Sequence, residues 1–180
     1  MLLEALNNLP KEFETERIYA RSMTDNDAPQ LLEIWSDDNV THHMNIETFH
    51  AVSEVSEMIS AIELEATACR YVIIDKSTNE MIGSFGINEL YLNSMTAEIG
   101  YELKESHWRK GIMTEILSSF IAVIQTTTTI SALTAKVSPE NIASSQLLMK
   151  LDFHFDKVVS EFNMQKKMLE TVDQYWRKLA

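Results

Sequence analysis

The chain lacks the cysteines that a disulfide framework requires, because Cys69 is the only one among its 180 residues. A lone cysteine suits a reducing compartment, and we expect Cys69 to be a small apolar filler at the edge of a strand. No apolar run approaches the length that spans a bilayer. The N-terminus also lacks the basic segment and apolar run of a signal peptide. We therefore expect a cytoplasmic protein with no membrane partner.

Basic residues are scarce as well, since 15 Lys and Arg face 27 Asp and Glu and the formal net charge is −12. Affinity for nucleic-acid phosphates comes from clustered Lys and Arg, so this balance argues against a nucleic-acid partner. The acidity would attract a cationic substrate such as an amine or a basic peptide. It would equally serve solubility alone, and the scattered placement of the acidic residues favours that explanation.

The chain has 45% apolar residues and no break in composition, which predicts one domain with a single sizeable core. We assign residues 1–14 to an N-terminal arm with a short helix over 2–8, and residues 15–180 to the domain. Alternating apolar and polar residues predict strands, and apolar residues at helical spacing predict helices. The predicted strands cover 16–22, 70–75, 81–91, 97–103 and 130–137, and two of the predicted helices cover 24–35 and 52–64.

Local signals support these assignments. Thr24 and Asp27 have the spacing of a capping box, which opens the first of these two helices. A turn-rich linker over 76–80 joins two strands into a predicted hairpin. Gly83 and Gly86 lie inside the second strand of that hairpin and predict a bend or a close approach of another backbone.

Three histidines, His42, His43 and His50, lie within or directly after an irregular stretch over 40–49. The side chains of adjacent residues diverge on a strand and on a helix alike, and no Cys or H-x-x-x-H partner is near. We therefore predict no metal site. We interpret the stretch as a loop that lines the substrate side.

The stretch 97–116, AEIGYELKESHWRKGIMTEI, organises the rest of the chain. It predicts a strand, a short basic loop and a helix that begins at Ile112. Such a junction aims unpaired backbone N–H groups and the positive end of a helix dipole at one point. Arg109 and Lys110 add two cations, and Gly111 has no side chain to keep a ligand away. The pattern favours a phosphate-bearing ligand, although an exposed basic turn before an amphipathic helix would look the same.

Two motifs in this chain resemble the GNAT family of N-acetyltransferases. The family's pyrophosphate-loop pattern Q/R-x-x-G-x-G/A falls on 108–113, where Gly111 matches and Met113 replaces the usual Gly or Ala. A bulkier side chain at that position would narrow the approach to a pyrophosphate. A second pattern, x-P-x-N-x-x-S-x-x-x-x-x-K-x-G-F, is matched by Asn141, Ser144, Lys150 and Phe153, with Asp152 in place of the glycine. The resemblance covers about residues 16–155, and it is greatest to the branch of ribosomal-protein-alanine N-acetyltransferases.

The resemblance implies an α/β (α+β) GNAT fold. We expect a mixed, mostly antiparallel, twisted sheet of six to seven strands with about four helices. A V-shaped split between the fourth and fifth strands would hold the cofactor. The family usually ends in a strand hairpin, which 157–164 and 168–176 would supply here. The apolar residues over 164–179 also fit one face of a helix, and we favour the hairpin because of the resemblance.

The resemblance also implies acetyl-CoA as the co-substrate, without a metal. Backbone groups of three strand residues would contact the acetyl and pantetheine arm, seven loop and helix residues would surround the pyrophosphate, and two residues of the last helix would complete the site. In that order, these residues are Tyr101, Glu102 and Leu103; Trp108, Arg109, Lys110, Gly111, Ile112, Met113 and Thr114; and Asn141 and Ser144.

Two residues, Glu98 and Ser144, carry candidate chemistry. Glu98, on the central strand beside the acetyl site, is the candidate base, acting through water; the alternative is an ordinary exposed carboxylate. By resemblance, Ser144 protonates the departing CoA thiolate and Asn141 holds the pantetheine amides. Both residues would also suit plain capping of a helix N-terminus.

We therefore expect an N-acetyltransferase that moves an acetyl group to a primary amine, either a protein N-terminus or a small molecule, in a ternary complex. One alternative is a CoA-binding sensor or interaction module without turnover, which Met113 keeps open. Another is a structural α/β domain that binds no CoA. A homodimer is compatible with the sequence, although no residue pattern points to one.

Overall fold

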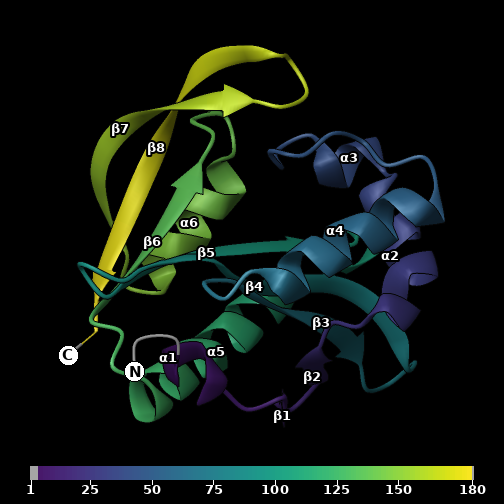
Figure 1. Cartoon of the computed structure of the whole chain (residues 1–180), viewed down its shortest axis with the longest axis horizontal. Coiled ribbons are helices and arrows are strands. Elements are labelled where there is room, and N and C mark those ends of the chain that lie inside the picture. Colours follow the sequence, from purple (N-terminus) through teal and green to yellow (C-terminus); the bar gives the residue numbers. More distant parts are fainter. Residues whose placement is uncertain (1–3, 180) are drawn as a thin grey trace.

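The computed structural model describes residues 4–179, which form an eight-stranded sheet with helices on both faces (Figure 1). The strands lie in the order β1-β2-β3-β4-β5-β6-β8-β7. Their bounds are β1 Glu12–Glu14, β2 Ile18–Ser22, β3 Cys69–Asp75, β4 Glu80–Tyr91, β5 Thr96–Leu103, β6 Ala132–Val137, β7 His154–Asn163 and β8 Met168–Lys178. The helices are α1 Glu4–Asn7, α2 Ala28–Trp35, α3 Asp38–Thr41, α4 Val52–Leu64, α5 Ile112–Thr127 and α6 Ile142–Lys150, with 3-10 turns η1 Asp25–Asp27 and η2 Glu105–His107.

The mixed, mostly antiparallel sheet expected from the sequence is confirmed. All neighbouring strands pair antiparallel except β5 and β6. The sheet has one strand more than the expected six to seven, because residues 12–14 pair with β2. Of the helices in the described part of the chain, the four long ones are α2, α4, α5 and α6, and α1 and α3 have one turn each.

The split in the sheet lies between β5 and β6, the fourth and fifth strands of the sequence prediction. These parallel strands pair only from Thr96 with Ala132 to Glu98 with Thr134. Beyond Glu98, β5 keeps its partner β4 on one side and has no β6 partner on the other. Alternate backbone N–H and C=O groups on that edge of β5 are therefore not used by the sheet.

Two hydrophobic clusters occupy the two faces of the sheet. The larger includes α5, whose Phe120 is fully buried, and the smaller includes α2 and α4, with Leu31 fully buried. Burial of side chains of this size contributes about 1.5–3 kcal/mol each. These clusters hold the strands on either side of the split in fixed positions.

The segment predicted as an N-terminal arm lies against the larger cluster. Leu6 and Leu9 are buried there, and the ring of Phe13 stacks on Phe120 with centroids 6.2 Å apart. The predicted helix over 2–8 is described as Glu4–Asn7, and its positions 2 and 3 lie outside the described residues.

Most element predictions are confirmed. Thr24 and Asp27 form the capping box, and the helix over 52–64 has the predicted bounds. The tail forms the hairpin β7–β8 and not a helix, because both strands find partners: β8 lies between β6 and β7. Its turn has Lys167 in the left-handed region, at φ 56°.

The predicted close approach at the β4 glycines is also confirmed. A Cβ atom on Gly83 would lie 2.3 Å from the carbonyl oxygen of Glu102, and one on Gly86 would lie 2.1 Å from that of Cys69. No side chain fits at such distances. At the end of α6, Asp152 adopts φ 63°, the left-handed conformation that glycine takes more easily.

Candidate cofactor and acceptor site

The loop between β5 and α5 contains two residues in the left-handed region. Arg109 has φ 60° and Gly111, the N-cap of α5, has φ 73°. Turns of this kind bring successive backbone N–H groups toward one point, and the N-terminus of a sixteen-residue helix adds its positive dipole end there. Arg109 and Lys110 are both exposed. The loop has the features of an anion-binding site.

The side chain of Trp108 fixes the start of this loop. Its indole Nε1–H donates to the carbonyl oxygen of Leu103 at 2.6 Å. Leu103, the last residue of β5, is itself buried. The sequence singled out Trp108 as a position in a motif, and the structure shows that its indole ties the loop to the end of β5.

Arg17 braces the other end of the loop, a contact that the sequence analysis missed. Its Nη1 donates to the Lys110 carbonyl at 2.8 Å, and its Nε pairs with the Glu115 carboxylate at 2.7 Å. Thr15 donates to the same carboxylate at 2.5 Å. Burial would raise the pKa of Glu115, but the hydrogen bonds from Thr15 and Arg17 leave it below its ordinary value. The first turn of α5 is thereby fixed to the start of β2.

The first residues of α5 face in different directions. Ile112 and Met113 are buried in the larger core cluster, and Thr114 is half-buried. The bulk of Met113, which departs from the motif, is accommodated among core side chains. A Cβ atom on Gly111 would have Arg17 Nη2 as its nearest neighbour, at 3.6 Å, so the space beside this glycine is open.

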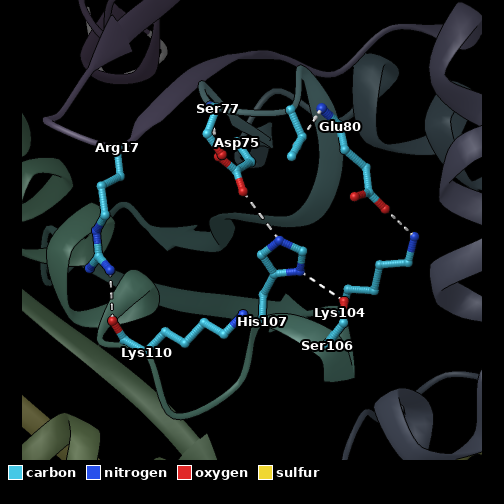
Figure 2. Close-up of polar contacts among 9 residues, drawn as sticks. Arg17, Asp75, Ser77, Glu80, Lys104, Ser106, His107 and Lys110 are labelled. Carbon is cyan, nitrogen blue, oxygen red and sulfur yellow. Dashed lines mark hydrogen bonds and ion pairs between the residues drawn. The ribbon is translucent and has the colours of Figure 1, made fainter.

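A cavity of about 470 Å³ adjoins the loop and is lined by Arg17, Lys110, Ile112 and the β3 end (Figure 2). His107 stands in its wall between Asp75, whose Oδ2 is 3.3 Å from Nε2, and Ser106, whose hydroxyl is 2.8 Å from Nδ1. Hydrogen bonds from the Ser77 hydroxyl, the Ser77 N–H and then His107 hold the pKa of Asp75 below its ordinary range. These contacts attach the loop to β3.

On the far side of the split, the hydroxyl groups of Tyr101 and Ser144 lie 2.5 Å apart. Tyr101 comes from the unpaired stretch of β5 and Ser144 from the first turn of α6. Burial raises the pKa of Tyr101 to about 12, although its bond with Ser144 acts in the opposite direction. The phenol therefore keeps its proton at neutral pH, and either hydroxyl can donate in this bond.

Asn141 caps α6 as its residue type suggested. Its side-chain oxygen accepts from the Ser144 N–H at 3.2 Å. The capping interpretation of Asn141 is thus confirmed, and it leaves the side-chain NH₂ group available. Ser144, in contrast, makes its side-chain contact with Tyr101 across the split.

Glu98 is the last β5 residue that pairs with β6, and its carboxylate is largely shielded, with 14% of the side chain exposed. One oxygen lies 3.2 Å from Lys136 Nζ, and the other accepts from Asn88 Nδ2 at 3.3 Å. Burial would lower the pKa of Lys136, but the Glu98 carboxylate leaves it raised. Glu98 is therefore an ion-paired group at the opening of the split, not an isolated surface carboxylate.

Glu102 has a buried side chain on the same face as Glu98. Its carboxylate pairs with Arg70 and accepts from Ser84 and from Trp35 Nε1, the last at 2.9 Å. Only 3% of this side chain is exposed. The sequence analysis assigned Glu102 to the site only for its backbone groups. Its side chain belongs to a buried polar cluster with Arg70, Ser84 and Trp35.

The pairing of β4 with β5 contains one register shift, and it lies in β4. Ile87 pairs with Ile99 and Glu89 with Glu98, so Asn88 is the extra residue. The pairing of β5 with β4 is otherwise continuous.

The stretch predicted to line the substrate side meets the tip of the β7–β8 hairpin. Asn45 bonds to two backbone groups there, the Phe162 carbonyl at 3.0 Å and the Met164 N–H at 2.8 Å. Gln165 donates to the carbonyls of Thr41 and Met44 at 2.7 and 3.0 Å. The hairpin and the 41–47 loop, which lie on opposite sides of the split, are thus joined (Figure 1).

The rings of His42 and His43 lie 4.6 Å apart, and burial together with His42 lowers the pKa of His43. Within residues 4–179, no three His, Cys, Asp or Glu side chains gather as metal ligands. Among the helices in this same part of the chain, none is long and apolar enough to cross a membrane.

A family model described as "Acetyltransferase (GNAT) domain" matches residues 17–154. The uncharacterized N-acetyltransferase p20 of Bacillus licheniformis is 38% identical over 164 residues, covering 89% of this chain and 91% of the relative. The [ribosomal protein uS5]-alanine N-acetyltransferase of Escherichia coli is 24% identical, covering 95% and 89%. A solved spermidine N-acetyltransferase from Vibrio cholerae, in complex with CoA and spermine, matches with a TM-score of 0.80 at 15% identity, covering 92% of this chain and 97% of that one.

Proposed function

The chain belongs to the GNAT family of N-acetyltransferases, and we propose that it transfers the acetyl group of acetyl-CoA directly to a primary amine in a ternary complex. The observation that carries this proposal is the opening of the sheet beyond Glu98, which leaves one edge of β5 unpaired. The pantetheine arm contains amide groups, which would form hydrogen bonds with the unpaired backbone groups of β5 as an additional strand would. The anion-binding loop lies at the end of the same strand.

The residues of the loop fit the pyrophosphate of CoA. Its left-handed residues Arg109 and Gly111 direct backbone N–H groups to one place, and the side of Gly111 is open to a ligand. Arg109 and Lys110 supply positive charge in an otherwise acidic chain. Asn141 would hold the pantetheine amides through its free NH₂ group.

The chemistry requires a polarised thioester carbonyl, an uncharged amine and a proton for the leaving sulfur. A backbone N–H of β5 among Tyr101, Glu102 and Leu103 supplies the first, and a preorganised donor of this kind contributes about 2.7–4 kcal/mol. Glu98 accepts the amine proton through water. The C–N bond forms, the C–S bond breaks, and Ser144, hydrogen-bonded to Tyr101, protonates the thiolate. Ser144 regains a proton from water, and Glu98 returns the amine proton to water.

The acceptor is a protein N-terminal amine or a small-molecule amine, in the cytoplasm. The relatives named above act on a ribosomal-protein alanine in one case and on spermidine in another. A protein N-terminal amine titrates near ~8 and a lysine side chain near ~10.4, so the N-terminal amine needs less help from Glu98. Peptides that begin with alanine, and spermidine, are therefore the first acceptors to assay.

Thermal melting with and without acetyl-CoA, beside a free-CoA control, tests the cofactor site. A ligand at a hundred times its dissociation constant stabilises the folded state by about 2.7 kcal/mol. We expect a clear rise in Tm that R109E/K110E abolishes. The matched control K157E/K178E has the same change of charge at exposed hairpin positions and keeps the rise.

Acetyl transfer to the peptide and spermidine panel, followed by release of the CoA thiol, separates the enzyme from a CoA-binding sensor. A Tm shift together with acetylation supports the proposal. A shift without acetylation of any amine would favour the sensor. No shift at millimolar acetyl-CoA would rule out the cofactor site.

A further inference from the structure

Asn88 is the extra residue of the β4 bulge, and its side chain lies directly over the central strand. A Cβ atom on Gly100 would come within 2.6 Å of the Asn88 amide nitrogen and 2.7 Å of its oxygen. A side chain at position 100 would therefore displace the Asn88 amide from this place. The bulge and the glycine together place one amide group on β5 beside Glu98.

The guanidinium of Arg70, which is largely but not fully shielded, determines which way this amide faces. Arg70 Nη1 donates to Asn88 Oδ1 at 3.2 Å, and a guanidinium has no acceptor, so the amide oxygen must face Arg70. The NH₂ group therefore faces Glu98, whose Oε2 is 3.3 Å away. The Glu98 carboxylate therefore accepts a hydrogen bond from an amide whose orientation is fixed by Arg70.

Arg70 is itself held in place from behind. Its side chain is 12% exposed, its Nε donates to Ser84 at 2.9 Å, and its Nη2 pairs with the buried carboxylate of Glu102. The chain of contacts runs from the buried Glu102 through Arg70 and Asn88 to Glu98. It ends at Lys136 on β6, across the mouth of the split.

We propose that Asn88 is a positioning residue that, held by Arg70, orients the Glu98 carboxylate toward the acceptor amine. This inference rests on the proposed function, in which Glu98 accepts the amine proton. Lys136 holds one carboxylate oxygen and Asn88 the other, so the plane of the carboxylate is determined. The lone pairs that remain face the water or amine in the split.

Four charged or titratable groups lie around Glu98. Lys136 contacts it from β6, and Glu89 is its register partner on β4. Tyr91 also lies near it on β4, where burial and then Glu98 raise the tyrosine pKa, and Arg70 acts through Asn88. Lys136 neutralises the charge of Glu98, but a flexible ammonium is a point charge that does not fix the carboxylate plane. The directional contact is the one from Asn88.

The test separates the shape of Asn88 from its donor. N88D keeps the shape that fills the space over Gly100 but replaces the NH₂ donor by a second carboxylate oxygen. Because N88D also adds a negative charge beside Glu98, it is compared with N88A, which removes the donor without adding a charge. We expect N88D and N88A both to lower kcat about tenfold or more. This is a part of the 10²–10⁴-fold rate acceleration that a general base typically contributes. The KM for acetyl-CoA stays unchanged, and N93A, at an exposed Asn in the β4–β5 turn, keeps wild-type values.

A double-mutant cycle with E98Q shows whether Asn88 acts through Glu98. In the E98Q background, N88A should lower kcat less than twofold further. Full additivity, or a wild-type kcat in N88D, would overturn the proposal.

A measurement that does not depend on catalysis tests the Asn88–Glu98 contact independently of the proposed function. The Asn88 side-chain NH₂ signals in a ¹⁵N NMR spectrum, assigned by their loss in N88D, should shift in E98Q and stay in place in the control E57Q, at an exposed position on α4. If they do not respond to E98Q, Asn88 does not engage Glu98 and the proposal is wrong. If the wild-type protein acetylates no amine, the proposed function is wrong. The NMR spectrum still shows in that case whether Asn88 contacts Glu98.

Discussion

The hydroxyl groups of Tyr101 on β5 and Ser144 on α6 meet at 2.5 Å across the line where β5 and β6 separate. The contact joins the two halves of the sheet at the point where their backbone pairing has ended. It also ties the candidate proton donor, Ser144, to the half-buried phenol of Tyr101. This pair is therefore open to tests of both stability and catalysis.

Removal of either hydroxyl leaves the other without its partner. Y101F and S144A should each lower the free energy of unfolding by about 1 kcal/mol, the usual net value of a hydrogen bond. The double variant should lose less than the sum, because both substitutions remove the same bond. Urea unfolding measures all three. Strict additivity would mean that the hydroxyls do not interact.

Catalysis distinguishes the two members of the pair. If Ser144 donates to the leaving sulfur, S144A lowers kcat and leaves the KM for acetyl-CoA unchanged. Y101F should have the smaller effect, because its hydroxyl reaches the sulfur only through Ser144. The contrary ranking would make Tyr101 the direct donor.

The raised pKa of Tyr101 predicts a loss of stability in alkali. The folded protein keeps the phenolic proton up to about pH 12, whereas the unfolded chain releases it near ~10. The stabilisation is complete below pH 10 and falls by about 1.4 kcal/mol per pH unit between these values. Burial also raises the pKa of Cys69, to about 11, and that of Tyr71, so several groups contribute.

Y101F isolates the contribution of one phenol. Its free energy of unfolding, measured in urea at several values between pH 9 and pH 11, should fall less steeply than that of the wild type. Identical slopes would show that Tyr101 titrates as it does in the unfolded chain.

Gly111 offers a test of the loop conformation. Its φ of 73° is strained for a residue with a Cβ, while the nearest atom to such a Cβ is 3.6 Å away. G111A should therefore cost about 1–2 kcal/mol through the backbone alone. Asn adopts the left-handed region more easily, so G111N should retain more stability than G111A.

Affinity responds differently from stability at this position. Any side chain at 111 crowds the ligand side of the loop, so both G111A and G111N should bind acetyl-CoA more weakly than the wild type. Isothermal titration measures this. If G111N bound as tightly as the wild type, the loop would not approach the cofactor at Gly111.

The parts of the molecule that the sequence predicted correctly are those set by neighbouring residues. The strand, loop and helix over 97–116 and the helix over 52–64 each follow from their own periodicity. The brace between Arg17 and Glu115 joins residues 98 positions apart, and no local pattern encodes it. Asn88 gains its place only through a bulge and a facing glycine on another strand.

The hydrogen bonds between the hairpin tip and the 41–47 loop could not be predicted from the sequence for the same reason, because they join residues more than 100 positions apart. N45A/Q165A removes four of these hydrogen bonds. If the 41–47 loop lines the acceptor side, its release should raise the KM for the amine several-fold and leave the KM for acetyl-CoA unchanged.

The matched control for this last variant is Q174A. It removes a 3.0 Å bond to Asp156 that stays within the hairpin, so the tip keeps its contact with the loop. Steady-state kinetics with the peptide and spermidine acceptors should show wild-type values for Q174A. A fall in the amine KM of N45A/Q165A would reverse the argument, because it would mean that the contact between the hairpin tip and the loop obstructs the acceptor and opens to admit it.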